Sequence, residues 1–94
     1  MNIRRLILDV GKGINRPTLL ELCESISSVK GVEGVNIIVT EIDIETMGLN
    51  ITIEGSQINY DNVVTNIEET GAVVHSLDEV AVGPKLIENI RRDE

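Results

Sequence analysis

The spacing of the apolar residues changes four times along this chain, and the order of those changes leaves few folds open. Four segments carry β-branched runs or alternate apolar and polar residues, as strands do: residues 3–10, 35–44, 49–54 and 72–82. Two others, residues 17–30 and 59–71, place apolar side chains three and four positions apart, as one face of a helix does. The predicted order is therefore strand, helix, strand, strand, helix, strand.

Local signals support both predicted helices. Thr18 and Glu21 have the spacing of a capping box at the start of the first helix. Asn59 or Asp61 can cap the second helix, and Gly71 stands where a helix ends in a left-handed residue. These signals place both helices between strands, as the order requires.

Two strand–helix–strand units joined through a hairpin, with its turn at residues 45–48, predict a ferredoxin-like α+β sandwich. This fold has a four-stranded antiparallel sheet with both helices on one face. We expect a single domain over residues 1–94. Its last part, residues 83–94, is predicted to form a short helical tail built on Leu86, Ile87 and Ile90.

The fold leaves the other face of the sheet without helices. On the predicted register this face carries aliphatic side chains among polar ones: Ile7, Ile38, Ile42, Val73 and Leu77, with Thr40, Thr52 and His75. A contiguous aliphatic patch on a small protein usually marks a surface for a partner. The pattern therefore predicts self-association.

Composition argues against several classes of partner. The chain has 8 basic and 16 acidic residues, so its net charge of −8 repels a phosphate backbone, and Tyr60 is its only aromatic residue. We expect neither nucleic acid nor a membrane as a partner, because the uncharged runs are too short to span a bilayer. Cys23 is a single cysteine in an apolar helical stripe, which favours core packing in a reducing, cytoplasmic setting.

One group of candidate cation ligands lies at the end of the second predicted strand. Glu41, Asp43 and Glu45 recur at a spacing of two, which places their carboxylates on one side of a strand. Hard oxygen ligands favour Ca²⁺ or Mg²⁺ over zinc. The alternative interpretation is a solvated strand end before a turn.

A second group surrounds the only histidine. His75 and Asp9 fall on neighbouring strands of the helix-free face, where an Asp–His pair can hold a metal ion or a proton. Asp78 and Glu79 follow His75 closely, although Asp78 faces the other side of the strand unless a bulge intervenes. The alternative interpretation is a polar contact inside an interface.

Two glycines are candidates for binding a small ligand. Gly11 and Gly13 join the first strand to the first helix, where related folds hold ligands with backbone N–H groups. The segment matches neither common phosphate-binding pattern, and a turn explains both glycines equally well. One histidine and one cysteine on unrelated elements make nucleophilic catalysis improbable.

Three segments carry a resemblance to a known family: KGVEGVNI at residues 30–37, EIDIET at 41–46 and HSLDEV at 75–80. With them the chain resembles a small archaeal domain-of-unknown-function family with a ferredoxin-like fold. The resemblance implies a cytoplasmic archaeal protein that assembles into closed homo-oligomeric rings, binds divalent cations such as calcium, and has no established activity.

We therefore expect a homo-oligomeric binding protein rather than an enzyme. It would hold a divalent cation or a small ligand at the junctions between subunits, where association brings together acids from several copies. Two alternatives stay open. One is an ACT-like regulatory module with its ligand at Gly11 and Gly13, and the other is an enzyme that uses His75 with a carboxylate at an intersubunit cleft.

Overall fold

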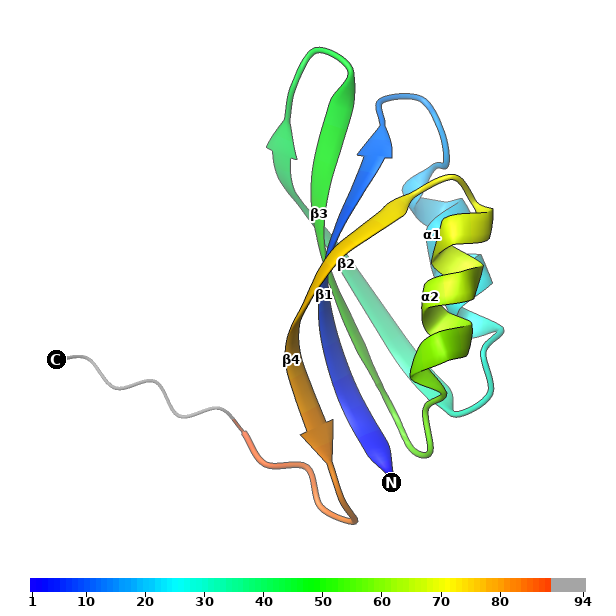
Figure 1. The fold of residues 1–94 in the computed structure, drawn as a ribbon, viewed down its shortest axis with the longest axis vertical. Coiled ribbons are helices and arrows are strands. Elements are labelled where there is room, and N and C mark those ends of the chain that lie inside the picture. Colours follow the sequence, from blue (N-terminus) through cyan, green and yellow to red (C-terminus); the bar gives the residue numbers. More distant parts are fainter. Residues whose placement is uncertain (89–94) are drawn as a thin grey trace, which may run out of the picture.

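The computed structural model of the chain describes residues 1–88 and contains all six predicted elements in the predicted order. The elements are β1 (Ile3–Gly13), α1 (Leu19–Ser27), β2 (Val32–Ile42), β3 (Thr46–Gly55), α2 (Tyr60–Glu69) and β4 (Val73–Val82). The strands form one antiparallel sheet in the order β2-β3-β1-β4, and both helices lie on the same face of it (Figure 1). This is the ferredoxin-like sandwich that the sequence predicts.

The helix caps are those that the sequence predicts. The Thr18 side chain accepts a hydrogen bond from the Glu21 N–H at 3.1 Å, and the Glu21 carboxylate accepts one from the Thr18 N–H at 2.8 Å. This second bond, with the nearby charge of Arg16, holds the pKa of the Glu21 carboxyl below its usual value. Asn59 caps α2, and Gly71 has a φ of +102° at the end of that helix.

β1 and β3 are longer than the sequence predicts. β1 continues through Gly13, and β3 begins at Thr46, so the turn of the β2–β3 hairpin lies at residues 43–45 rather than 45–48. Gly11 is paired on both sides, with Gly48 of β3 and Val73 of β4. Hydrogen bonds from two neighbouring strands hold this glycine-rich segment in the sheet, although glycines usually indicate a break in a strand.

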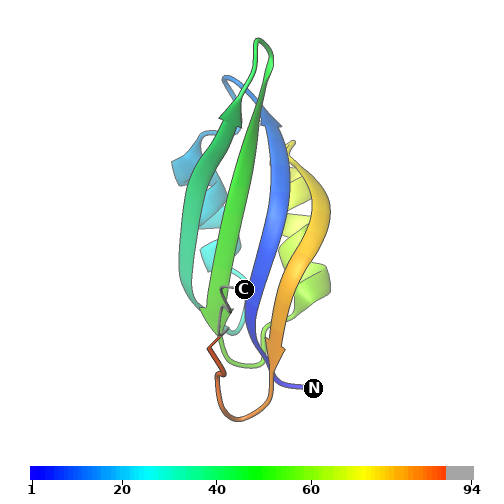
Figure 2. The same ribbon diagram turned by 90° about the vertical axis from the view of Figure 1, so that its left-hand side faces the viewer.

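The predicted C-terminal helix is not seen in the described residues. Residues 86–88 are not helical, and the rest of that prediction, residues 89–94 with Ile90, lies outside the part of the chain that the structure describes. Gly83 has a φ of +120° and turns the chain away from β4. The following segment runs across the lower end of the helix-free face (Figure 2).

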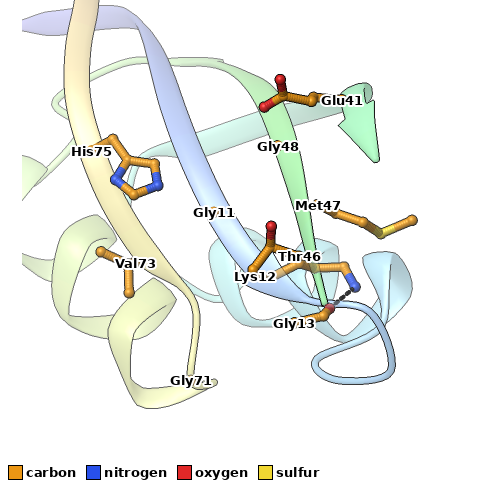
Figure 3. A pocket seen from close by; sticks show the side chains of 10 residues that line it. All are labelled: Gly11, Lys12, Gly13, Glu41, Thr46, Met47, Gly48, Gly71, Val73 and His75. Atoms are coloured by element: carbon orange, nitrogen blue, oxygen red, sulfur yellow. Dashed lines mark hydrogen bonds between the residues drawn. The ribbon is translucent and has the colours of Figure 1, made fainter. Parts of the chain in front are cut away.

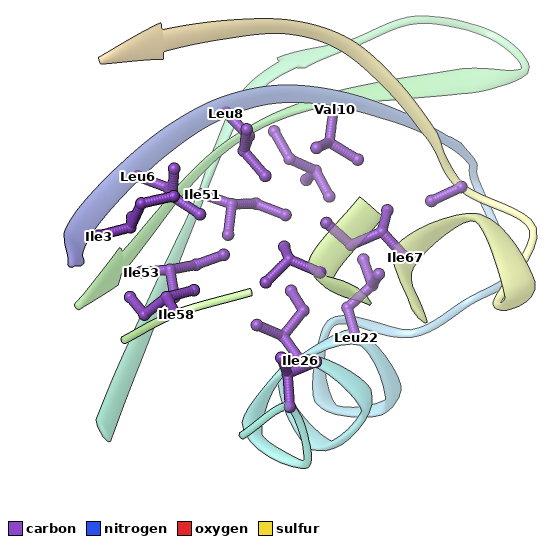
Figure 4. Close-up of a cluster of buried hydrophobic side chains, with 14 residues drawn as sticks. Ile3, Leu6, Leu8, Val10, Leu22, Ile26, Ile51, Ile53, Ile58 and Ile67 are labelled. Atoms are coloured by element: carbon purple, nitrogen blue, oxygen red, sulfur yellow. The ribbon is translucent and has the colours of Figure 1, made fainter. Parts of the chain in front are cut away.

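The core lies between the sheet and the helices and consists of aliphatic side chains (Figure 4). Its largest members are fully buried: Leu6, Leu8, Val10, Leu22, Ile26, Leu49, Ile51, Ile53, Val63 and Ile67. Cys23 of α1 is half-buried. Within residues 1–88 no helix has the length and apolar character needed to cross a membrane.

Bulges in the two edge strands change which residues face away from the helices. After a bulge in β2, Ile42 pairs with Met47, which also pairs with Lys12 on the same face as the core. In β4, Leu77 pairs with the core residue Leu8. The prediction that Ile42 and Leu77 belong to the helix-free face was therefore wrong, because one inserted residue moves the following side chains to the other face.

The helix-free face is consequently less apolar than predicted. With these bulges, the register leaves three large apolar side chains on this face: Ile7, Ile38 and Val73. Polar residues separate them, since Asn50 pairs with both Asp9 and Ile38. This face is a mixed surface rather than a continuous aliphatic patch.

One buried cation anchors the lower part of this face. Arg5 is buried, and its guanidinium binds three carboxylates: Glu54 of β3 at 2.8 Å, Glu79 of β4 at 3.2 Å and Glu88 of the C-terminal segment at 3.0 Å. Donation to Glu54, and next to Glu88, raises the pKa of Arg5 above its ordinary value, so the side chain stays charged. Arg5 thus joins two strands and the C-terminal segment through one guanidinium.

Candidate functional site

A pocket of about 490 Å³ lies at the end of the sheet where β1 and β3 carry glycines (Figure 3). We call it the glycine pocket. Residues from all four strands line it, together with Gly71 from the segment before β4: Gly11, Lys12, Gly13, Glu41, Thr46, Met47, Gly48, Gly71, Val73 and His75. It is an open depression rather than an enclosed cavity.

The floor of the glycine pocket is a row of paired residues across the sheet. Glu41 of β2 pairs with Gly48 of β3, Gly48 pairs with Gly11 of β1, and Gly11 pairs with Val73 of β4. The two central strands therefore contribute no side chains to this row. At this point of the sheet the backbone is not covered by side chains of β1 and β3 themselves, and side chains of the two edge strands reach over it instead.

His75 stands directly over this floor. It is the extra residue of a bulge in β4, because Asp9 pairs with Ser76 while the next residue, Val10, pairs with Val74. A Cβ atom added to Gly11 would lie 2.5 Å from Nε2 of His75, so the imidazole occupies space that any other residue at position 11 would fill. The glycine and the bulge together set the position of the imidazole.

Glu41 stands on the opposite rim. The β2 bulge turns it toward the helix-free face, and its Cβ would lie 3.3 Å from a Cβ added to Gly48. The Glu41 and His75 side chains are both exposed to solvent. Figure 3 shows them on either side of the glycine floor, so a carboxylate and an imidazole border the same depression.

Lys12 is a lining residue that the sequence analysis did not single out. It is buried on the helix side, and its Nζ donates to the Gly13 carbonyl at 2.8 Å and to the Ile14 carbonyl at 3.4 Å. Figure 3 shows the amino group directed at this loop rather than toward His75. Lys12 therefore stabilises the loop at the pocket's edge, and within residues 1–88 it forms no ion pair.

Four of the nine predicted site residues meet in this pocket, and the other five, all acids, lie outside it. The lining includes Gly11, Gly13, Glu41 and His75. Asp43 lies in the hairpin turn, where its Oδ1 accepts the Ile44 N–H at 2.8 Å.

The other four predicted acids have separate positions. Glu45 is exposed at the end of the hairpin turn and does not line the pocket. Asp9 is half-buried on β1, opposite Asn50, and does not line the pocket. Asp78 accepts a hydrogen bond from the Ser76 hydroxyl at 2.6 Å, and Glu79 binds Arg5. Residues 1–88 of a single copy contain no group of three His, Cys, Asp or Glu side chains that could hold a metal ion.

Comparison with known proteins gives a family and one relative. A family model described as "Uncharacterized ArCR" matches residues 4–94. Uncharacterized protein MJ0319 of the archaeon Methanocaldococcus jannaschii is 40% identical over 89 residues, which cover 95% of this chain and 91% of that protein. The match extends over the whole fold, including the strands that form the glycine pocket.

Proposed function

The chain belongs to DUF211, a family of uncharacterised proteins with unknown function, and from its own geometry we propose that it is a self-associating binding protein that holds a divalent cation in the glycine pocket. The observation that carries this proposal is the position of Glu41 and His75 on two rims of one glycine floor. Glu41 offers the hard oxygen that Ca²⁺ and Mg²⁺ prefer. His75 can hydrogen-bond a water molecule of the ion's shell.

The number of ligands supports a junction between copies. Ca²⁺ takes about six to eight oxygen ligands, and one copy supplies a single carboxylate at this pocket. The remaining ligands would be water and carboxylates from a neighbouring copy. Each chain carries a net charge of −8, so a bound cation would also reduce the repulsion between associating copies.

A small organic ligand is the second candidate, and the size of the pocket favours it. A volume of about 490 Å³ exceeds what one ion needs and falls in the range of small-molecule sites, roughly 300–1,000 Å³. Backbone groups near Gly11 and Gly13 would contact such a ligand, as in an ACT-like module. An enzyme based on His75 is less well supported, because the exposed imidazole is not shielded from water and Asp9 does not line the pocket.

Calorimetric titration with Ca²⁺ and Mg²⁺ tests the cation proposal. We expect Glu41→Gln to weaken binding by about tenfold or more, because it removes the carboxylate that borders the pocket. Asp43→Asn is the matched control, since it makes the same charge change on the same hairpin but outside the pocket. Its dissociation constant should change much less than that of Glu41→Gln, because the Asp43 carboxylate does not line the pocket and accepts the Ile44 N–H in the hairpin turn.

Three results would contradict the proposal. If the wild-type protein binds neither Ca²⁺ nor Mg²⁺, the glycine pocket is not a divalent-cation site. Equal weakening in both variants would indicate general attraction to an acidic surface. Unchanged binding in Glu41→Gln would place the ion elsewhere.

A further inference from the structure

The charges around the glycine pocket do not balance a divalent cation. Two charged side chains line the pocket, the positive Lys12 and the negative Glu41, so its lining has no net charge when His75 is neutral. A bound Ca²⁺ or Mg²⁺ would therefore leave two positive charges there without a partner. Because uncompensated charge is costly wherever protein displaces water, the cation calls for a further anionic ligand.

Lys12 contributes to this imbalance before any ion binds. Its side chain is only 6% exposed, and its Nζ donates to the carbonyl oxygens of Gly13 and Ile14, which are neutral acceptors. No carboxylate of residues 1–88 forms an ion pair with it, although the chain has 16 acidic and only 8 basic residues. A lysine is rarely buried without a counter-ion, so this one at the edge of a pocket points to a negatively charged ligand.

The pocket has room for such a ligand beside the ion. Gly11 and Gly48 pair with each other and together remove two side chains from one layer of the sheet. Val73 and Met47 of the lining offer apolar surface to a short carbon chain. The imidazole of His75 stands over this floor, and a ring nitrogen can donate a hydrogen bond to a carboxylate oxygen.

We propose that the glycine pocket holds its divalent cation together with a small dicarboxylate. One carboxylate would bind the ion opposite Glu41 and supply oxygen ligands that one copy of the chain lacks. The second would lie toward Lys12, which is on the other side of the pocket from His75 (Figure 3). The two negative charges of the ligand would then match the two positive charges left over. This inference rests on the proposed cation site and names the organic ligand that shares it.

The backbone favours a dicarboxylate over a phosphate. Phosphate sites commonly use free N–H groups of a glycine-rich loop at the start of a helix. Here Gly11 and Gly48 each pair with strands on both sides, so their backbone groups belong to the sheet. The segment from Gly11 to Gly13 also matches neither common phosphate-binding pattern. A carboxylate needs fewer donors, because the cation itself neutralises it.

Calorimetric titration with succinate, in the absence and presence of saturating Mg²⁺, tests the proposal. We expect succinate to bind about tenfold more tightly when Mg²⁺ is present, and Mg²⁺ to gain the same factor from succinate, because coupling between two ligands is reciprocal. Butyrate is the matched control ligand, since it has the same chain length and one carboxylate, and it should show much weaker coupling. Succinate titrated into Mg²⁺ buffer without protein corrects for chelation in solution.

A lysine variant gives a signature that loss of structure would not produce. Lys12→Met should weaken succinate binding in the presence of Mg²⁺ by about tenfold, because it removes a charged hydrogen-bond donor. The same variant should bind Mg²⁺ alone more tightly, because it removes a positive charge beside the ion. Partial unfolding would weaken both. Lys30→Met makes the same charge change at an exposed position outside the pocket and should alter both constants much less.

The possible failures are distinguishable. If Mg²⁺ binds but succinate does not affect it, the dicarboxylate is wrong and the cation site stands. If neither Mg²⁺ nor Ca²⁺ binds, the proposed function fails and this inference fails with it. Equal succinate binding with and without Mg²⁺ would show an anion site independent of the ion. Coupling as strong with butyrate, or stronger with inorganic phosphate, would also overturn the assignment to a dicarboxylate.

Discussion

Replacing Gly55 with alanine is expected to lower the free energy of unfolding by about 3 kcal/mol or more, because the added methyl group meets backbone that cannot rotate away. Gly55 is buried at the end of β3. A Cβ there would overlap the Gly31 carbonyl oxygen and lie 3.0 Å from the Glu33 nitrogen. The same carbonyl accepts the Ser56 N–H at 2.9 Å, so moving it would also break a hydrogen bond.

Gly34→Ala is the control for this substitution. It lies on β2 near the same end of the sheet, and a Cβ there would meet no atom of residues 1–88 within 4 Å. We expect its stability to stay within about 0.5 kcal/mol of wild type. Urea denaturation of both variants measures the difference. Equal midpoints for the two variants would contradict the close approach of β3 to the segment before β2.

Replacing Arg5 with methionine is expected to cost about 2–3 kcal/mol. Removing one partner of a buried ion pair costs about 3–5 kcal/mol, and this value is reduced here because the carboxylates of Glu54 and Glu88 are well exposed. Methionine replaces the packing of the side chain but leaves three carboxylates close together without a cation. The variant should also release the C-terminal segment, whose Glu88 binds Arg5.

Arg16→Met provides the comparison for an exposed pair. Arg16 binds Glu21 at 2.7 Å, but its side chain is mostly exposed, so this substitution should cost much less stability than Arg5→Met. Adding Glu79→Gln to Arg5→Met should restore part of the lost stability, because it removes one of the repelling charges. Thermal unfolding of the single and double variants measures each effect. A cost for Arg5→Met no larger than that for Arg16→Met would show that the buried guanidinium does not organise this face.

Short-range signals account for the parts of the fold that the sequence predicts well. The capping box of Thr18 and Glu21, the cap at Asn59 and the left-handed Gly71 each depend on residues within a few positions of one another. The alternation of Leu49, Ile51 and Ile53 directly reflects a sheet with one covered face. Such features need no knowledge of the partner strand.

Features that depend on neighbouring strands were not predictable in this way. Gly11 and Gly48 suggest turns when each is taken alone, whereas in the sheet they face each other and form the floor of a pocket. A bulge adds a residue to one strand only, and its position depends on the partner. For this reason Ile42 and Leu77 were assigned to the wrong face.

In the candidate site, too, the residue types were predictable from the sequence, whereas their positions depend on neighbouring strands. His75 and Glu41 were recognised as candidate ligands, but the predicted register placed Ile42 on the helix-free face and therefore its neighbour Glu41 on the other face. The bulge in β2 brings Glu41 to the pocket of His75, and the bulge in β4 places His75 over Gly11. The role of Lys12 depends on the path of the loop after Gly13, which the sequence pattern does not specify.

The most direct test of the cation proposal is the place where a paramagnetic ion binds. In a ¹⁵N-labelled sample, substoichiometric Mn²⁺ broadens the amide signals nearest to its binding site, and Mn²⁺ prefers the same carboxylate and water ligands as Mg²⁺ and Ca²⁺. Broadening that begins at Gly11, Gly48 and His75, and that excess Ca²⁺ reverses, is the predicted result. Broadening that begins in the acidic hairpin turn at residues 43–45, or uniform weak broadening over the whole acidic surface, would contradict a cation site in the glycine pocket.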